Sequence, residues 1–173
     1  MPTPLPDLSL ADWSVLGVVA EGPTHGWPVV QTLKADGPLG RVWTVPRPVV
    51  YRSLTTLAHE GLVEECGEAP GERGPQRTIV RVTRKGRSAL TRWLATPVMH
   101  VRDIRSEFLM KLALSARAGT PTDDLVTRQL DALAPVIAAV SSPPAGDDFD
   151  LVLARWRHEQ AVAVERFLRA LER

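Results

Sequence analysis

From residue 46 to residue 83 the chain reads PRPVVYRSLTTLAHEGLVEECGEAPGERGPQRTIVRVT. Pro48 suits the first position of a helix, where a backbone N–H is not needed, and apolar residues then recur at helical spacing until Gly61 ends the run. One face of this predicted helix is apolar, with Val50, Leu54, Leu57 and Ala58. The other face carries side chains able to reach phosphates and base edges, which are Arg47, Val49, Tyr51, Arg52, Thr55, Thr56 and His59.

A β-hairpin is predicted directly after this helix. Its strands are Leu62–Cys66 and Gln76–Val82, and the glycines and prolines of Gly67–Pro75 predict a flexible loop between them. A helix followed by such a hairpin is the order of a winged helix-turn-helix. The stretch therefore predicts that fold, and a basic hairpin beside a polar helix face favours DNA binding over catalysis.

Helices are also predicted on both sides of this stretch. Ser9, with Asp12 three residues later, is a candidate cap for a first helix. A second helix follows Thr24, with Trp27, Val29, Val30 and Leu33 expected on its buried side. Thr83 is expected to cap a fourth helix that ends before Pro97, with Leu90, Trp93 and Leu94 on its apolar side.

The remainder of the chain has a helical pattern almost throughout. Helices are predicted over Asp103–Ala118, from Asp123 until Pro135 kinks or ends it, and over Asp148–Glu172. The last of these carries a stripe suited to packing against a long helix of a second subunit. The expected fold is mainly α with a small β-hairpin, divided into a winged helix-turn-helix domain over residues 1–96 and a helical dimerisation region over residues 97–173.

Composition limits the possible functions. The 173 residues carry a net charge of only +1, so DNA binding must depend on local charge, and residues 71–92 hold seven basic residues against one acid, Glu72. The single cysteine, Cys66, excludes an internal disulfide framework. Neither an apolar run of membrane-spanning length nor a secretory signal is evident, so a cytoplasmic protein without membrane contact is expected. The four histidines lack metal-site spacing and no catalytic motif is present, so no metal, no cofactor and no enzymatic activity is expected.

Several motifs together resemble the PadR family of bacterial transcriptional regulators. The resemblance covers nearly the whole chain and rests on Gly22–Trp27 (GPTHGW), Val50–Leu57 (VYRSLTTL) with Glu60–Val63 (EGLV), Gly74–Arg77 (GPQR) and Val82–Gly86 (VTRKG). Residues from Trp93 to Leu112 are similar to the longer subfamily, which has a multi-helix carboxy-terminal dimerisation region. Departures are Trp27 in place of tyrosine, Pro48 in place of a small residue, and Ile79–Val80 where tyrosines are common.

The resemblance implies a homodimer that binds double-stranded DNA at a pseudo-palindromic operator, with one recognition helix in each major groove. Tyr51, Arg52 and Thr55 are then candidate base or phosphate contacts and Arg47 a phosphate contact. The other expected DNA contacts are Thr24 and His25 as backbone anchors and Arg73 and Arg77 in the wing. A solvated helix face is the alternative for all of them. Arg81, Arg84, Lys85 and Arg87 either extend this surface or only solvate the start of the fourth helix.

The large aromatic residues have two possible roles. PadR relatives sense small aromatic or cationic effectors at the dimer interface, which makes Trp13 and Trp93 candidates for an effector pocket. Phe108, Trp156 and Phe167 are candidates for dimerisation. Ordinary core packing is the alternative for all five residues.

An effector-responsive repressor is the function that the sequence favours. Its alternative is a winged-helix protein-interaction module without an operator of its own. An enzyme acting in the interface cavity is a third reading, for which no nucleophile or base is apparent.

Overall fold

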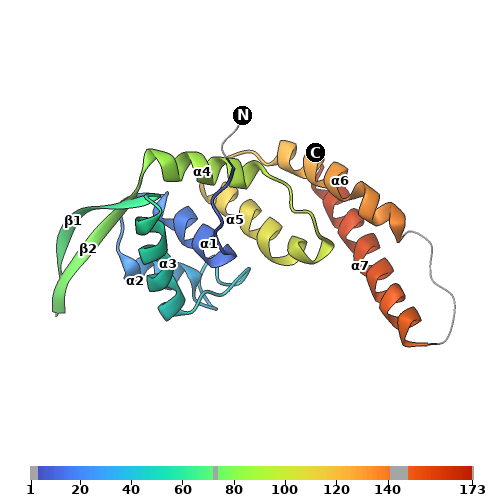
Figure 1. The fold of residues 1–173 in the computed structure, drawn as a ribbon, viewed down its shortest axis with the longest axis horizontal. Coiled ribbons are helices and arrows are strands. Elements are labelled where there is room, and N and C mark those ends of the chain that lie inside the picture. The colour runs from blue at the N-terminus through green and yellow to red at the C-terminus, as the bar shows by residue number, and fades with distance from the viewer. Residues whose placement is uncertain (1–3, 72–73, 141–147, 173) are drawn as a thin grey trace. The chain divides into compact units, whose positions relative to one another are not determined.

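The computed structural model describes residues 4–71, 74–140 and 148–172. Its elements, shown in Figure 1, are α1 (Leu10–Val19), α2 (Gly26–Leu33), α3 (Arg47–His59), β1 (Val63–Gly71), β2 (Gly74–Val82), α4 (Arg84–Ala95), the 3₁₀ turn η1 (Val101–Asp103), the π-helical turn η2 (Ile104–Phe108), α5 (Leu109–Arg117), α6 (Asp123–Ala139) and α7 (Phe149–Leu171). The predicted fold class, mainly α with one antiparallel hairpin, is confirmed.

The chain forms two compact units. Met1–Leu94 and Met110–Gly119 make up the first unit, and Ala95–Leu109 and Thr120–Arg173 the second. The first unit therefore holds α1 to α4, the hairpin and nearly all of α5. The predicted boundary at residue 96 stays a prediction about domains.

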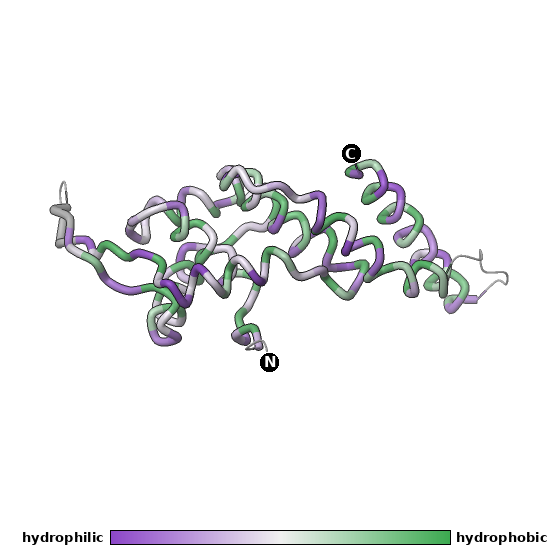
Figure 2. Tube along the Cα trace, turned by 90° about the horizontal axis from the view of Figure 1, so that it is seen from above, coloured by the Kyte–Doolittle hydropathy of each residue, from purple (hydrophilic) through white to green (hydrophobic). Residues whose placement is uncertain are grey.

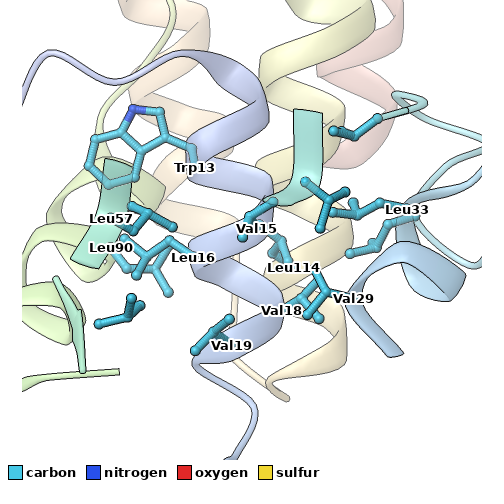
Figure 3. Close-up of a cluster of buried hydrophobic side chains, with 14 of the residues drawn as sticks. Trp13, Val15, Leu16, Val18, Val19, Val29, Leu33, Leu57, Leu90 and Leu114 are labelled. Carbon is cyan, nitrogen blue, oxygen red and sulfur yellow. The ribbon is translucent and has the colours of Figure 1, made fainter. Parts of the chain in front are cut away.

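Helix α1 lies at the centre of the first unit. Ser9 and Asp12 form the predicted capping box, in which Asp12 N donates to Ser9 Oγ at 3.2 Å and Ser9 N donates to an Asp12 carboxylate oxygen at 3.0 Å. All residues from Trp13 to Val19 are buried. Figure 3 shows the side chains of Trp13, Val15, Leu16, Val18 and Val19 in one cluster with those of Val29, Leu33, Leu57, Leu90 and Leu114. Because neighbours surround α1, it needs apolar residues on every side.

Local sequence sets the ends of α3 and α4. Pro48 is the second residue of α3 and not the first as predicted, because the helix begins at Arg47, but it still lies in the first turn, where no N–H is needed. Gly61 follows the helix, as predicted, with a φ of 65°, a conformation that glycine adopts without cost. Thr83 caps α4 as predicted, because its Oγ1 accepts from Gly86 N at 3.0 Å. The same hydroxyl approaches the carbonyl oxygen of Gly61 at 2.8 Å, which ties the start of α4 to the end of α3.

The hairpin strands are longer than predicted. Pairing runs from Val63 opposite Val82 to Gly71 opposite Gly74, so the strands occupy most of Gly67–Pro75, where a flexible loop was predicted. That prediction was wrong. Register shifts between Glu65 and Gly67 and between Ala69 and Gly71 absorb the irregular residues, and a two-stranded hairpin leaves one edge of each strand without a ladder partner, where proline is tolerated.

The predicted helix over Asp103–Ala118 is not uniform. It begins as η1 and η2 and becomes regular only in α5. Ile104 and Phe108 are buried, as their spacing predicted. Leu109 and Leu112, predicted on the same face, are only half-buried, and the buried residues of α5 are Met110, Lys111, Leu114 and Ser115. The predicted apolar face is therefore correct only before α5, and the change of helical pitch has no signal in the sequence.

The second unit contains the pair of helices α6 and α7. Pro135 lies inside α6 and does not end it; the residue is exposed, so water can reach the carbonyl that lacks a donor, while Leu133 and Ile137 beside it are buried. Helix α7 follows its prediction closely, with Asp148 as its cap accepting from Leu151 N at 3.1 Å. The predicted break over Ser141–Gly146 lies outside the described residues.

A buried glutamine joins two segments of this unit. Gln129, fully buried on α6, accepts from Val98 N at 2.8 Å and donates to Val98 O at 2.9 Å. A side-chain amide thus satisfies both backbone groups of one residue in the segment after α4, as a β-strand partner would.

Candidate nucleic-acid interface

The exposed face of α3 carries the residues predicted for DNA contact. Arg47, Tyr51, Arg52 and Thr55 are exposed, whereas Val50, Ser53 and Leu57 on the opposite face are buried. Thr55 Oγ1 donates to Tyr51 O at 3.2 Å, which leaves the lone pairs of the hydroxyl available. Within the described residues neither Arg47 nor Arg52 has an ion pair with an acid.

The start of α2 is joined to the wing. Thr24 N donates to Val80 O at 3.0 Å and Val80 N donates to Thr24 O at 2.8 Å, which forms an isolated antiparallel bridge to β2. His25 is the cap of α2, and its Nδ1 accepts from Trp27 N at 3.3 Å. The bridge therefore holds the α2 cap beside the basic strand of the wing.

This cap brings two predicted DNA contacts together. The imidazole of His25 uses Nδ1 for the cap and has its other ring nitrogen, Nε2, toward the wing. Arg77 Nη1 lies 3.5 Å from this Nε2. The guanidinium of Arg77 and the imidazole of His25 therefore lie side by side at the surface.

The start of α2 also contacts α3. A Cβ built on Gly26 would lie 2.5 Å from Tyr51 Cε1, so the tyrosine ring is seated against this glycine. Arg47 Cζ lies 5.9 Å from the centroid of the Trp27 ring and 5.8 Å from that of the Tyr51 ring. Trp27 was expected on the buried side of α2, but it is 48% exposed, and that expectation was wrong.

Helical spacing contains the signal that was missed. The buried residues of α2 define one face of the helix, and they are Val29, Val30 and Leu33. Since successive residues are rotated by about 100° around the helix axis, Trp27 points more than 100° away from the centre of this face. The large apolar side chain of Trp27 suggested burial, whereas its position on the helix predicts exposure.

Acids on β1 lower the positive charge of the wing. Glu64 lies opposite Arg81 in the ladder, and its Oε1 accepts from Arg81 Nε at 2.8 Å. Lys85 is also engaged, since its Nζ donates to Glu60 O at 2.6 Å. Within the basic run that begins at residue 71, Arg81 is therefore paired with an acid on the strand before it, and Lys85 contacts a backbone carbonyl. Of the wing residues predicted to contact DNA, Arg77 is exposed and Arg73 lies outside the described residues.

The tryptophans predicted to line an effector pocket are core residues. The rings of Trp13 and Trp93 stack with centroids 5.0 Å apart and planes 6° apart, and each side chain is only 4% exposed. Lys111, also buried, places its Nζ 4.8 Å from the centroid of the Trp93 ring.

The three aromatic residues predicted for dimerisation differ in exposure. Phe108 is fully buried within its own chain and does not offer its ring to a second copy. Trp156 on α7 is 59% exposed, and Phe167 is half-buried.

Two classes of site are absent from the described part of the chain. No helix there is long and apolar enough to cross a membrane. No group of three or more metal-ligating side chains occurs among those residues either.

Comparisons with known proteins agree with this architecture. Residues 15–92 match the family described as transcriptional regulator PadR-like family. Bacillus subtilis PadR in complex with operator DNA is similar in structure, with 18% sequence identity, 94% of this chain and 97% of that chain covered, and a TM-score of 0.50.

Two further solved structures are similar at lower scores. Bacillus subtilis PadR matches with 17% identity, 98% and 96% coverage and a TM-score of 0.44. Smu.1604c from Streptococcus mutans UA159 matches with 16% identity, 92% and 96% coverage and a TM-score of 0.44. No curated protein matches the chain. The winged-helix part of the chain, residues 15–92, therefore matches the PadR-like family of transcriptional regulators, and the chain shares its fold with Bacillus subtilis PadR.

Proposed function

We propose that the protein is a homodimeric repressor that binds a pseudo-palindromic operator and responds to a small effector. The observation that carries the DNA-binding part is a connected surface of donors from three elements. Arg77 on β2 adjoins His25 at the start of α2, Trp27 follows that cap, and Arg47 on α3 lies beside Trp27. The wing, the α2 cap and the recognition helix therefore present their donors together.

This surface suits a nucleic-acid backbone as well as base edges. The side chains of His25 and Arg77 meet at the amino end of α2, where the helix dipole also favours an anion. We assign this pair to a phosphate, with Thr24 holding the cap in place through its bridge to Val80. Along α3, Tyr51, Arg52 and Thr55 are assigned to the major groove.

Selection of binding sites from a randomised duplex library at about physiological salt tests the proposal, because specificity has meaning only at a stated ionic strength. The expected result is a two-fold-symmetric motif with half-sites about one helical turn apart. The double variant Tyr51→Ala/Arg52→Ala should lose the enrichment, whereas Arg81→Ala, at an arginine already paired with Glu64, should retain it. Unchanged specific binding by the double variant would refute the assignment of α3.

A protein-interaction module is the competing function, and the acids of β1 favour it to some extent. Glu64, Glu65 and Glu68 lie on β1 opposite Arg81, Val80 and Thr78 of β2, so the wing is not uniformly positive. Such a module would show no enriched motif, and any weak DNA binding would vanish as the salt concentration rises.

The effector response is tested at the tryptophan pair. An aromatic or cationic effector that binds there must separate the stacked rings of Trp13 and Trp93 or dock beside them, since both are buried. Titration with phenolic acids and planar cations should then change tryptophan emission and weaken operator binding together. Unchanged emission and unchanged operator affinity across the panel would remove the effector from the proposal.

A further inference from the structure

The contact between Arg47 and two exposed aromatic rings has no role in the fold itself. Trp27 is 48% exposed and Tyr51 is 42% exposed. The Cζ atom of Arg47 lies 5.9 Å from the centroid of the Trp27 ring and 5.8 Å from that of the Tyr51 ring. We call these three residues the aromatic clamp. Each ring leaves nearly half of its surface exposed, so burial of apolar area accounts for only part of their position beside Arg47.

Stacking leaves the arginine free to bind something else. A cation–π contact uses the flat face of the guanidinium, and the N–H groups at its edge remain unused. The structure shows no hydrogen bond or ion pair for Arg47 among the described residues. The two ring contacts thus place the guanidinium, and its N–H groups stay available.

The position of Arg47 on α3 indicates which group its N–H donors contact. Arg47 is the first residue of the helix, and a cation there is disfavoured by the helix dipole, so local helix stability does not explain it. In helix-turn-helix proteins the amino-terminal residues of the recognition helix contact base edges. The commonest specific contact of an oriented guanidinium in the major groove is the bidentate pair with O6 and N7 of guanine.

We propose that Arg47 reads one guanine in each operator half-site and that Trp27 is a positioning residue, which with Tyr51 holds the guanidinium for that contact. This inference rests on the proposed DNA-binding function and replaces the phosphate contact expected for Arg47 from sequence. Gly26 is part of the arrangement, because the Tyr51 ring occupies the space that a Cβ at this position would fill.

The test measures base discrimination at each position rather than affinity alone. Wild-type protein first selects its motif, and a panel of duplexes then carries one symmetric base-pair substitution each. The substitution Arg47→Lys keeps the positive charge but removes the planar pair of N–H donors that the guanidinium offers to one base. Discrimination at one G·C pair per half-site should therefore fall by about 5- to 150-fold, with discrimination at the other positions unchanged. A phosphate contact would instead be largely preserved by lysine.

Variants at Trp27 test the positioning role. Trp27→Ala should reduce discrimination at that same G·C pair, and Trp27→Phe should restore most of it, since a phenyl face also stacks on guanidinium. Trp43→Ala is the matched control, because Trp43 is likewise exposed, at 39%, and has no arginine over its ring among the described residues. It should leave the discrimination profile unchanged.

Three outcomes would overturn the inference. If Arg47→Ala weakens binding to all duplexes equally and lowers the log–log salt slope by about 0.9, the amount expected for one phosphate that is no longer neutralised, Arg47 binds a phosphate. If Trp27→Ala alters discrimination at a different pair, or at none, Trp27 does not position Arg47. If wild-type protein enriches no motif, the proposed function itself fails, and this is seen before any variant is made.

Discussion

At Gly26, the addition of a single methyl group should weaken DNA binding without destabilising the fold. A Cβ there would lie 2.5 Å from Tyr51 Cε1 and 2.9 Å from Cζ, but these atoms belong to the end of an exposed side chain that can rotate away. We expect Gly26→Ala to leave the thermal midpoint within a few degrees of wild type. Operator affinity should fall roughly fivefold or more, because one oriented base contact contributes about 1–3 kcal/mol.

Gly22→Ala provides the control for this substitution. No atom lies within 4 Å of a Cβ at Gly22, which is in the connection between α1 and α2, four residues before Gly26. Thermal melts and operator titrations of the two variants should therefore differ in the titration only. A large loss of stability in Gly26→Ala would mean that Tyr51 cannot move, and equal affinities would mean that its ring position is irrelevant to DNA.

Arg117 forms a bidentate pair with Glu21 that joins the end of α5 to the turn after α1. Its Nε and Nη2 donate to the two carboxylate oxygens at 2.5 and 2.6 Å, and each side chain is about one third exposed, at 34% and 35%. Solvent screening limits such a pair, so a double-mutant cycle with Glu21→Gln and Arg117→Gln should give a coupling energy of about 0.5–1 kcal/mol that decreases with salt. A coupling near zero at low salt would contradict this geometry.

The same pair makes a prediction about pH. The hydrogen bond to Glu21 raises the pKa of the Arg117 guanidinium. A cation whose pKa is raised on folding contributes stability that is present below its unfolded pKa and is lost only as the pH rises past that value, which for arginine is far above neutrality. The difference in thermal midpoint between wild type and Arg117→Gln should thus be constant from about pH 7 to about pH 9, as measured by circular dichroism. A difference that shrinks across this range would assign the stabilisation to another group.

The stability of helix α4 depends on the hydroxyl group of Thr83 and on the absence of a side chain at Gly86. Thr83 Oγ1 accepts from Gly86 N, and a Cβ on Gly86 would lie 2.0 Å from Leu62 O, which is backbone and cannot rotate away. We expect Thr83→Ala to cost about 1 kcal/mol, as for other removed caps, and Thr83→Ser to cost little. Gly86→Ala should cost about 1–3 kcal/mol, the range for overpacking. Urea titrations would measure both, and a neutral Gly86→Ala would show that α4 can shift from β1.

The elements that could be predicted from sequence are those fixed by local chemistry. The caps Ser9, Thr83 and Asp148 and the stop at Gly61 act within four residues, so the ends of α1, α3, α4 and α7 were readable. The length of the hairpin and the continuation of α6 through Pro135 were not, because both depend on partners distant in sequence. Cross-strand pairing set the wing, and burial of Leu133 and Ile137 outweighed one missing hydrogen bond.

The candidate site was predictable in part for the same reason. The polar face of α3 follows from spacing alone, and its residues are exposed as that spacing requires. Arg77 contacts His25, which is 52 positions earlier in the chain, and Arg47 contacts Trp27, which is 20 positions earlier. No local sequence pattern predicts such contacts. Glu64 was missed because its partner, Arg81, is adjacent only in the folded hairpin.

An exposed apolar stripe on α7 is the basis for expecting two copies of the chain to associate. Phe149, Val152 and Trp156 are 76%, 60% and 59% exposed and recur at helical spacing, and the exposed Ala163 continues the same line. Figure 2 shows hydrophobic and hydrophilic residues alternating along this helix, which ends near the carboxy terminus. One long helix with this stripe suits an isologous contact with its own copy.

Introducing a charge into this stripe should dissociate the dimer. We expect Trp156→Glu to sediment as a monomer at concentrations where wild type is a dimer, because two glutamates would be buried close together. Operator affinity should fall by about 10²- to 10⁴-fold, since a monomer loses the advantage of binding two half-sites at once. Arg155→Glu, also exposed on α7 but away from the stripe, is the control for the added acid and should remain dimeric. If both variants stay dimeric, the subunits meet elsewhere, and if Trp156→Glu is monomeric yet binds the operator with full affinity, recognition does not require the second recognition helix.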